Sequence, residues 1–199
     1  MILSIGAGII ICYFIGSIPF SYLIARLAKG IDLRVAGEGN VGARNVWHVV
    51  GKPYGVLAGL LDFSKGLAAW GLGRIFSLES PAIWFLGFAA VCGHAFPLFL
   101  RGRGGKGAAT AMGFIFALAP VAILISAVVM LIAFFLFRDF HLAVAPGIAL
   151  IPILWRWPLH KRWEDVILLF ALLLFLGIKR LVDEPYMKRI KARTGWNKS

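Results

Sequence analysis

The sequence predicts an all-α fold, a single integral membrane domain over residues 1–199 that is a bundle of about seven transmembrane helices. Three observations predict this class. The chain is 60% hydrophobic and 15% charged, with a mean hydropathy of +0.86, whereas a soluble domain is about 45–50% apolar and about 25% charged. Several apolar stretches reach the roughly 20 residues needed to cross a hydrocarbon core of about 30 Å. Basic residues gather between these stretches, as in polytopic membrane proteins.

Six apolar blocks define the expected helices, at about residues 2–28, 54–76, 81–100, 108–137, 140–156 and 165–178. No basic residue precedes the first block, so we expect a first spanning helix rather than a cleaved signal peptide. The fourth block would be about 45 Å long as one helix. It contains Pro120 near its middle, where a helix loses a hydrogen bond and often breaks. Two helices joined near residues 118–120 give seven crossings, whereas one kinked helix gives six.

The basic residues favour seven crossings, with the N-terminus outside and the C-terminus inside. No basic side chain precedes the first block, whereas a short basic tail is expected to begin at about residue 185, and basic segments stay in the cytoplasm. Seven crossings place Arg156, Lys161 and Arg162 outside, against the same rule. Under either count the loops at residues 29–53 and 101–107 share the cytoplasmic side, because two crossings separate them.

The net charge of +12 and the pI of about 10.3 fit a membrane protein without a nucleic-acid partner. Basic loops set topology and attract anionic head groups of membrane lipids, and no soluble domain is present to offer a nucleic-acid surface. No group of His, Cys, Asp or Glu residues has metal-ligand spacing, so we expect neither a metal nor a cofactor. The sequence gives no oligomeric state.

The first of two glycine-rich basic loops occupies residues 37–45. Its candidate binding residues, together with an arginine just before it, are Arg34, Gly37, Gly39, Asn40, Gly42, Arg44 and Asn45. Glycines let successive N–H groups point into one concavity that suits a phosphate or carboxylate. Asparagines add amide donors and tolerate left-handed turns. The alternative is a flexible loop between helices.

The second loop occupies residues 101–107 and leads into the fourth apolar block. Its candidates are Gly104, Gly105, Lys106, Gly107 and, in the first helical turn, Thr110. A glycine turn that enters a helix N-terminus beside a lysine is an anion site. The P-loop spacing is absent and no strand precedes the loop, which excludes an NTPase of that kind. The alternative is a basic loop that only sets topology.

Three ionisable residues lie within the apolar blocks. Asp62 and Lys65 are one helical turn apart and are expected to pair, because such groups face the bundle interior. Their role is either structural or in substrate binding. His94 lies just before the second loop, as a structural residue or as an acid–base or ligand-contacting group. No Gly-x-Ser-x-Gly or His-x4-Asp motif supports a serine triad or a His–Asp acyltransferase.

Together these motifs resemble the PlsY-type family of membrane acyltransferases, which move a fatty acyl group from acyl-phosphate to glycerol 3-phosphate. The resemblance rests on the order and spacing of six motifs: residues 16–20, 32–34, 37–45, 62–66, 93–94 and 104–110. It implies a cytoplasm-facing site in the cell membrane that binds acyl-phosphate and glycerol 3-phosphate and forms lysophosphatidic acid and inorganic phosphate in phospholipid biosynthesis. The expected catalytic residues are Lys106, Asn45, Arg44 and His94, and Lys65 and Arg180 join the glycine loops in binding.

The chain departs from the family pattern at several positions. Glu38 stands where the family usually has Ser, Arg44 where it has Thr, and His48 and His141 also replace family residues. The C-terminal motif, a His followed by Asn-Ile-x-Arg-Leu, survives only as residues 177–181, without its His and Asn. We expect Arg44 to pair with Glu38. We also expect activity to be retained with Arg44 and His141 supplying replacement contacts.

Acyl-phosphate carries its own leaving group, so the site mainly has to align two anionic substrates and stabilise developing charge. The proton of the acceptor hydroxyl could pass to a substrate phosphate oxygen or to His94. Three other functions remain open: a paralogue acting on another phosphorylated acceptor, a non-catalytic lipid-binding protein, and an anion channel or transporter. The last is disfavoured because both glycine loops lie on one side rather than at the bilayer midplane.

Overall fold

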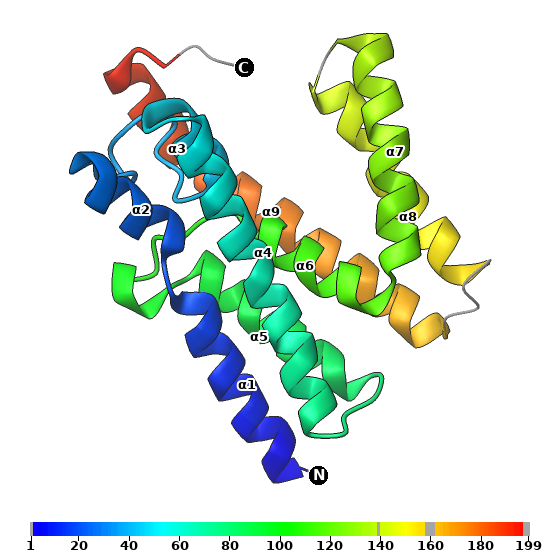
Figure 1. Cartoon of the computed structure of the whole chain (residues 1–199). Helices are drawn as coiled ribbons and strands as arrows, with labels where there is room; N and C mark the ends of the chain where they lie inside the picture. Colours follow the sequence, from blue (N-terminus) through cyan, green and yellow to red (C-terminus); the bar gives the residue numbers. More distant parts are fainter. Residues whose placement is uncertain (1, 139, 158–161, 197–199) are drawn as a thin grey trace.

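The computed structural model describes residues 2–138, 140–157 and 162–196, and the side chains of residues 140–145 are not among those described. Within these ranges the chain is helical and contains no strand (Figure 1). The elements are α1 (Ile2–Ser17), α2 (Phe20–Lys29), α3 (Ala43–Val49), α4 (Lys52–Ile75), α5 (Ala82–Ala95), the 3-10 helix η1 (Leu98–Leu100), α6 (Ala108–Leu118), α7 (Pro120–Phe137), α8 (Phe140–Arg156) and α9 (Trp163–Thr194).

Prolines divide two of the expected apolar blocks. The fourth block breaks at Ala119, whose φ of −151° and ψ of 71° are not helical, and Pro120 begins α7. This confirms the predicted break, because proline disfavours a helical residue before it but fits the first helical position. The first block was predicted to form one helix. This prediction was wrong, because Ile18 and Pro19 separate α1 from α2. The same property of proline explains both breaks.

Helices pack in pairs through glycine contacts that bring their backbones together. A Cβ added at Gly66 of α4 would lie 2.1 Å from the carbonyl oxygen of Thr110, and one at Gly113 of α6 would lie 2.0 Å from that of Phe63. Glycine at both positions therefore allows α4 and α6 to cross at backbone contact, as small residues do between membrane helices. The crossing fixes the start of α6, and with it the end of the second glycine loop.

The core has two parts. The larger contains buried residues of α1 and α4–α9, including an aromatic group in which Trp84 contacts Phe114 and Trp155, with ring centroids 5.4 and 5.9 Å apart. The smaller lies beneath the first glycine loop and contains Leu33, Val41 and Val46. The loop therefore has apolar anchors of its own, which hold its backbone against α2 and α3.

Helix α9 differs from its expected form. The last apolar block was expected to end near residue 178, with a basic tail from about residue 185, but the helix continues through Pro185 to Thr194. It passes behind α4 and α6, and its C-terminal part reaches the region of α2 and α3 (Figure 1). The α7–α8 hairpin stands apart from that region. The basic segment is thus helical structure beside the first glycine loop.

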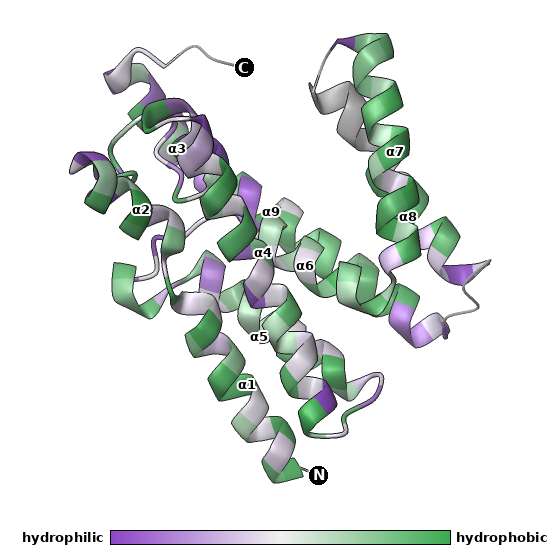
Figure 2. Ribbon diagram, in the orientation of Figure 1, coloured by the Kyte–Doolittle hydropathy of each residue, from purple (hydrophilic) through white to green (hydrophobic). Residues whose placement is uncertain are grey.

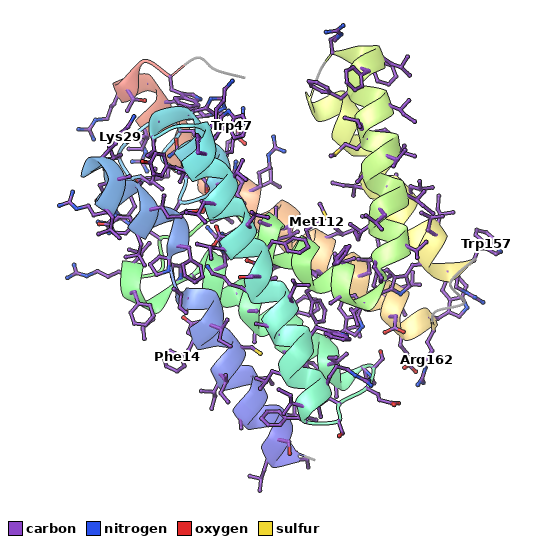
Figure 3. All side chains as sticks on the ribbon, in the orientation of Figure 1. Phe14, Lys29, Trp47, Met112, Trp157 and Arg162 are labelled. Atoms are coloured by element: carbon purple, nitrogen blue, oxygen red, sulfur yellow. The ribbon has the colours of Figure 1, made fainter. Side chains whose placement is uncertain are left out.

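Hydropathy divides the molecule along its length. Figure 2 shows hydrophilic residues concentrated around α3 and the C-terminal part of α9, whereas α7 is almost entirely hydrophobic. Among the described residues, three helical stretches are long and apolar enough to cross a membrane, Ile2–Lys29, Ala82–Leu100 and Pro120–Phe137. The labelled side chains mark the two polar regions: Lys29 and Trp47 near α2 and α3, and Trp157 and Arg162 at the α8–α9 connection (Figure 3).

Candidate anion-binding site between two glycine-rich loops

The first glycine loop is organised around the fully buried side chain of Asn45. Its amide nitrogen lies 2.9 Å from the carbonyl oxygen of Ala36, 3.0 Å from that of Asn40 and 3.3 Å from that of Leu33. Its amide oxygen accepts a hydrogen bond of 3.2 Å from the backbone N–H of Glu38. Backbone groups thus use both ends of the amide, and Asn45 holds the loop in shape.

Glycine is required at two positions of this loop by backbone conformation and by space. Gly37 and Gly39 have φ values of 58° and 75°, a region that L side chains avoid. A Cβ on Gly37 would lie 2.2 Å from the Asn45 amide oxygen, and one on Gly39 would lie 2.9 Å from the Cβ of Ile190. The loop is therefore held between α3 and the C-terminal part of α9.

Helix α9 also binds the loop through hydrogen bonds. The Tyr186 hydroxyl donates to the carbonyl oxygen of Arg34 at 2.7 Å, and the Thr194 hydroxyl donates to that of Gly37 at 2.8 Å. Sequence reasoning missed both contacts because it ended the last helix too early. A signal for the longer helix was present in the sequence. Between residues 163 and 194, Pro185 is the one strong helix terminator, and no glycine–proline turn occurs.

The second loop lies directly against the first. Gly105 donates its N–H to the carbonyl oxygen of His94 at 3.2 Å. A Cβ on Gly105 would lie 2.5 Å from the carbonyl oxygen of Val41 in the first loop and 2.3 Å from His94 Nε2, while one on Gly104 would lie 2.0 Å from the His94 carbonyl oxygen. Glycine at these positions lets the loops approach to backbone contact. Helix α6 then begins at Ala108, with Gly107 as its N-terminal cap residue at a φ of 81°.

Lys106 lies in a cluster of charged groups contributed by both loops and by α9. The side chain is half-buried. Burial lowers the pKa of the Lys106 ammonium below its usual value, and the negative charge of Glu38 partly opposes this effect. Three further cations lower the pKa as well: Arg180, Arg44 and Lys191. Four cations and one carboxylate therefore act on the same small region, which suits an anionic ligand.

Glu38 and Arg44 form the expected pair, and Arg44 Nη1 lies 3.5 Å from Glu38 Oε2. The Glu38 side chain is 1% exposed, whereas that of Arg44 is 37% exposed. The other carboxylate oxygen, Oε1, is buried and has no hydrogen-bond partner among the described residues. The separation exceeds the 2.7–2.9 Å of a strong charge-assisted hydrogen bond, so the pair is loose and one oxygen is unused.

A cluster of buried polar side chains lies next to the two loops. Asp62 Oδ1 lies 2.8 Å from Lys65 Nζ and 3.4 Å from His94 Nδ1, and the Ser21 hydroxyl donates to Asp62 Oδ2 at 2.9 Å. A small pocket lies beside these residues, and Gly104 and Gly105 also line it. The group links α2, α4 and α5, and through His94 it positions the second loop.

The structure brings together part of the predicted set. Lys106, Arg44 and Arg180 are close enough to interact electrostatically. Thr110 donates its hydroxyl to the carbonyl oxygen of Asp62 at 2.9 Å, so it anchors α6 to α4. Arg34 makes a bidentate pair with Asp32, at 2.7 Å for the shortest contact. The His141 side chain lies outside the described residues. Lys191, in the expected tail, was missed because tail basicity alone predicts only a cytoplasmic segment.

The fold and the paired loops define a class of protein, a helical integral membrane protein with a cationic region where two glycine-rich loops meet. A family model described as glycerol-3-phosphate acyltransferase matches residues 7–185, and the chain belongs to this family.

Curated relatives and solved structures agree with this assignment. The chain is 48% identical over 124 residues to the glycerol-3-phosphate acyltransferase of Aquifex aeolicus (strain VF5), covering 62% of this chain and 64% of that protein. It is 41% identical over 145 residues to that of Desulforamulus reducens, covering 73% and 72%. The crystal structure of PlsY, described as an integral membrane glycerol 3-phosphate acyltransferase in its glycerol 3-phosphate form, matches with a TM-score of 0.80 and 34% identity, over 98% of this chain and 94% of that one. The sequence match thus spans just under two thirds of the Aquifex protein.

Proposed function

We propose that this protein transfers a fatty acyl group from acyl-phosphate to glycerol 3-phosphate and forms lysophosphatidic acid and inorganic phosphate in phospholipid biosynthesis. The observation that carries the proposal is the meeting of two glycine loops in one cationic region around Lys106. The solved relatives are described in their glycerol 3-phosphate and lysophosphatidic acid forms, which supports the acceptor and the product. The cationic region around Lys106 supports acyl-phosphate as the donor, because this substrate carries its own leaving group and needs no covalent nucleophile.

In this proposal each loop binds a different part of the reacting substrates. The acyl-phosphate group binds at the start of α6, where Lys106 and the free N–H groups of the first helical turn meet it. Arg44, Arg180 and Asn40 contact the phosphate of the acceptor or the oxygen that becomes negative in the transition state. Asn45 and His94 act by holding these groups in place, since their polar atoms contact the loops and the buried Asp62.

The orientation of the protein follows from the basic residues. We propose seven crossings, with the N-terminus outside and the site at the cytoplasmic surface. The start of α1 and the end of α9 lie at opposite ends of the molecule (Figure 1), which supports an odd number of crossings. The cationic loops and the basic part of α9 lie at the end we place in the cytoplasm. The acyl chain of the donor would then reach the site from the bilayer.

The proposal is tested by replacing the central cation. Lys106→Ala is expected to lower kcat/KM for acyl-phosphate by roughly 10- to 100-fold or more, because loss of a hydrogen bond to a charged group costs about 1.5–3 kcal/mol. Rates are measured with purified protein in detergent, supplied with acyl-phosphate and glycerol 3-phosphate. Lys188→Ala serves as the matched control, because Lys188 lies on α9 with 73% of its side chain exposed. Equal rates in both variants would remove the second loop from the mechanism.

A further inference from the structure

The Glu38 side chain combines burial with an unused acceptor. It is 1% exposed, and its Oε1 atom has no hydrogen-bond partner among the described residues. A buried carboxylate oxygen without a partner is costly in a folded protein. Here it lies between the cations Arg44 and Lys106, in the region where the substrate phosphates are proposed to bind. An oxygen in that position can accept a hydrogen bond from a hydroxyl group of a bound ligand.

The other side chains that could accept a proton are held in contacts within the protein. His94 Nδ1 faces Lys65 Nζ at 3.5 Å and Asp62 Oδ1 at 3.4 Å, and its Nε2 packs against Gly105. Asp62 is paired with Lys65 beneath the loops, and Asp32 is paired with Arg34. Asp62 Oδ1 and Glu38 Oε1 are both buried without a hydrogen bond. Asp62 Oδ1 is held in the ion pair with Lys65, at 2.8 Å, so Glu38 Oε1 is the better candidate acceptor for a ligand among the described residues of the site.

Resting on the function proposed above, we propose that Glu38 binds the acceptor hydroxyl and takes its proton during acyl transfer. The charged groups that face Glu38 are Arg44 of α3 and Lys106 of the second loop, with Arg180 and Lys191 of α9 around Lys106. The family pattern usually has Ser at this position, a residue that is not a base at neutral pH. Glu38 therefore gives this chain a side-chain base in addition to its phosphate-binding groups.

Access to the carboxylate depends on Arg44. Arg44 contacts Glu38 at a distance of 3.5 Å, and more than a third of the Arg44 side chain is exposed. A bound phosphate offers Arg44 two oxygens in a geometry that suits the guanidinium better than this contact does. When Arg44 turns to the phosphate, Glu38 is left for the hydroxyl. Phosphate binding and exposure of the base are thus coupled through one arginine.

Acyl transfer with Glu38 as the base proceeds in two proton transfers. The hydroxyl oxygen of the acceptor attacks the acyl carbon as its proton moves to Glu38 Oε1. The new carbon–oxygen ester bond forms, the bond between the acyl carbon and the phosphate oxygen breaks, and phosphate leaves with the electron pair. The protonated Glu38 then returns the proton to the departing phosphate. No co-reactant beyond the two substrates is needed.

The test compares three substitutions in the purified full-length protein with acyl-phosphate and glycerol 3-phosphate. Glu38→Gln and Glu38→Ser remove the base and are expected to lower kcat by roughly 100-fold or more, the usual contribution of proton transfer. Glu38→Asp keeps a carboxylate and is expected to retain more activity than either. KM for acyl-phosphate should change little in all three. Glu184→Gln, a carboxylate on α9 that pairs with Lys188, is the control and should match the wild type.

The double variant Glu38→Ser/Arg44→Thr distinguishes two roles of Glu38, as a base and as a counter-ion of Arg44. If Glu38 only neutralised Arg44, removing both charges would restore kcat, and that result would overturn the proposal. We expect the double variant to bind inorganic phosphate, measured by calorimetry, better than the single variant Arg44→Thr does, while kcat of the double variant remains low. A kcat for Glu38→Gln within threefold of the wild type would also overturn the base role and leave acyl transfer standing. An inactive wild type would overturn both proposals.

Discussion

Asn45 was expected to act in catalysis, but its side chain instead holds the backbone of the first glycine loop in place. Its amide nitrogen contacts three carbonyl oxygens of the loop and its oxygen accepts one N–H, all within buried surroundings. Asn40 differs, because no hydrogen bond of its side-chain amide to another described residue is found, although the side chain is 8% exposed. From the sequence we expected Asn45 to act in catalysis and Asn40 in substrate binding. Only the folded loop shows which amide is already used.

This difference predicts separable effects. Asn45→Ala should lower the free energy of unfolding by about 2 kcal/mol or more, because it leaves buried backbone groups without partners. Asn40→Ala should leave stability nearly unchanged and raise KM for a substrate. Thermal unfolding in detergent, together with steady-state rates, distinguishes the two variants. Equal loss of stability in both would show that Asn45 does not organise the loop.

At the scale of elements, prolines and glycines account for what the sequence did and did not predict. Pro120 correctly located the break between α6 and α7, and Pro19 carried the same signal for α1 and α2. Glycines marked both loops, and the contact between the loops agrees with the expectation that both lie on one side of the membrane. The extent of α9 could not be read from hydropathy, because its last turns are mostly polar. They are held by hydrogen bonds from Tyr186 and Thr194 and by the buried side chain of Ile190.

The crossing of α4 and α6 provides the second structural prediction. Gly66→Ala should destabilise the protein and lower activity, because the added Cβ would lie 2.1 Å from a backbone oxygen and force the helices apart. Gly71→Ala is the matched control on the same helix, where a Cβ meets nothing within 4 Å. There the gain in helix propensity, about 1 kcal/mol relative to glycine, should leave stability equal or higher. Unfolding midpoints of the two variants in detergent decide the point, and equal midpoints would contradict the close crossing.

For the whole molecule, the distribution of charge joins fold and function. Helices α1, α5 and α7 belong to the long apolar stretches. Hydrophilic residues gather around α3 and the C-terminal part of α9 (Figure 2). Composition alone predicted the membrane class, and the similarity to the structure of PlsY, described as an integral membrane protein, confirmed it. Composition could not show that Arg180 and Lys191 of α9 join Lys106, because residues distant in sequence come together only through helix packing.

The central claim is that this paired-loop site carries out acyl transfer and not binding alone. The most direct measurement is product analysis by mass spectrometry after incubating the purified wild-type protein with acyl-phosphate and glycerol 3-phosphate. We predict lysophosphatidic acid carrying one acyl chain and inorganic phosphate released in equal amount, with both absent when either substrate is withheld. Saturable binding of acyl-phosphate without any acylated product would contradict the account and identify the protein as a non-catalytic lipid-binding member of its family.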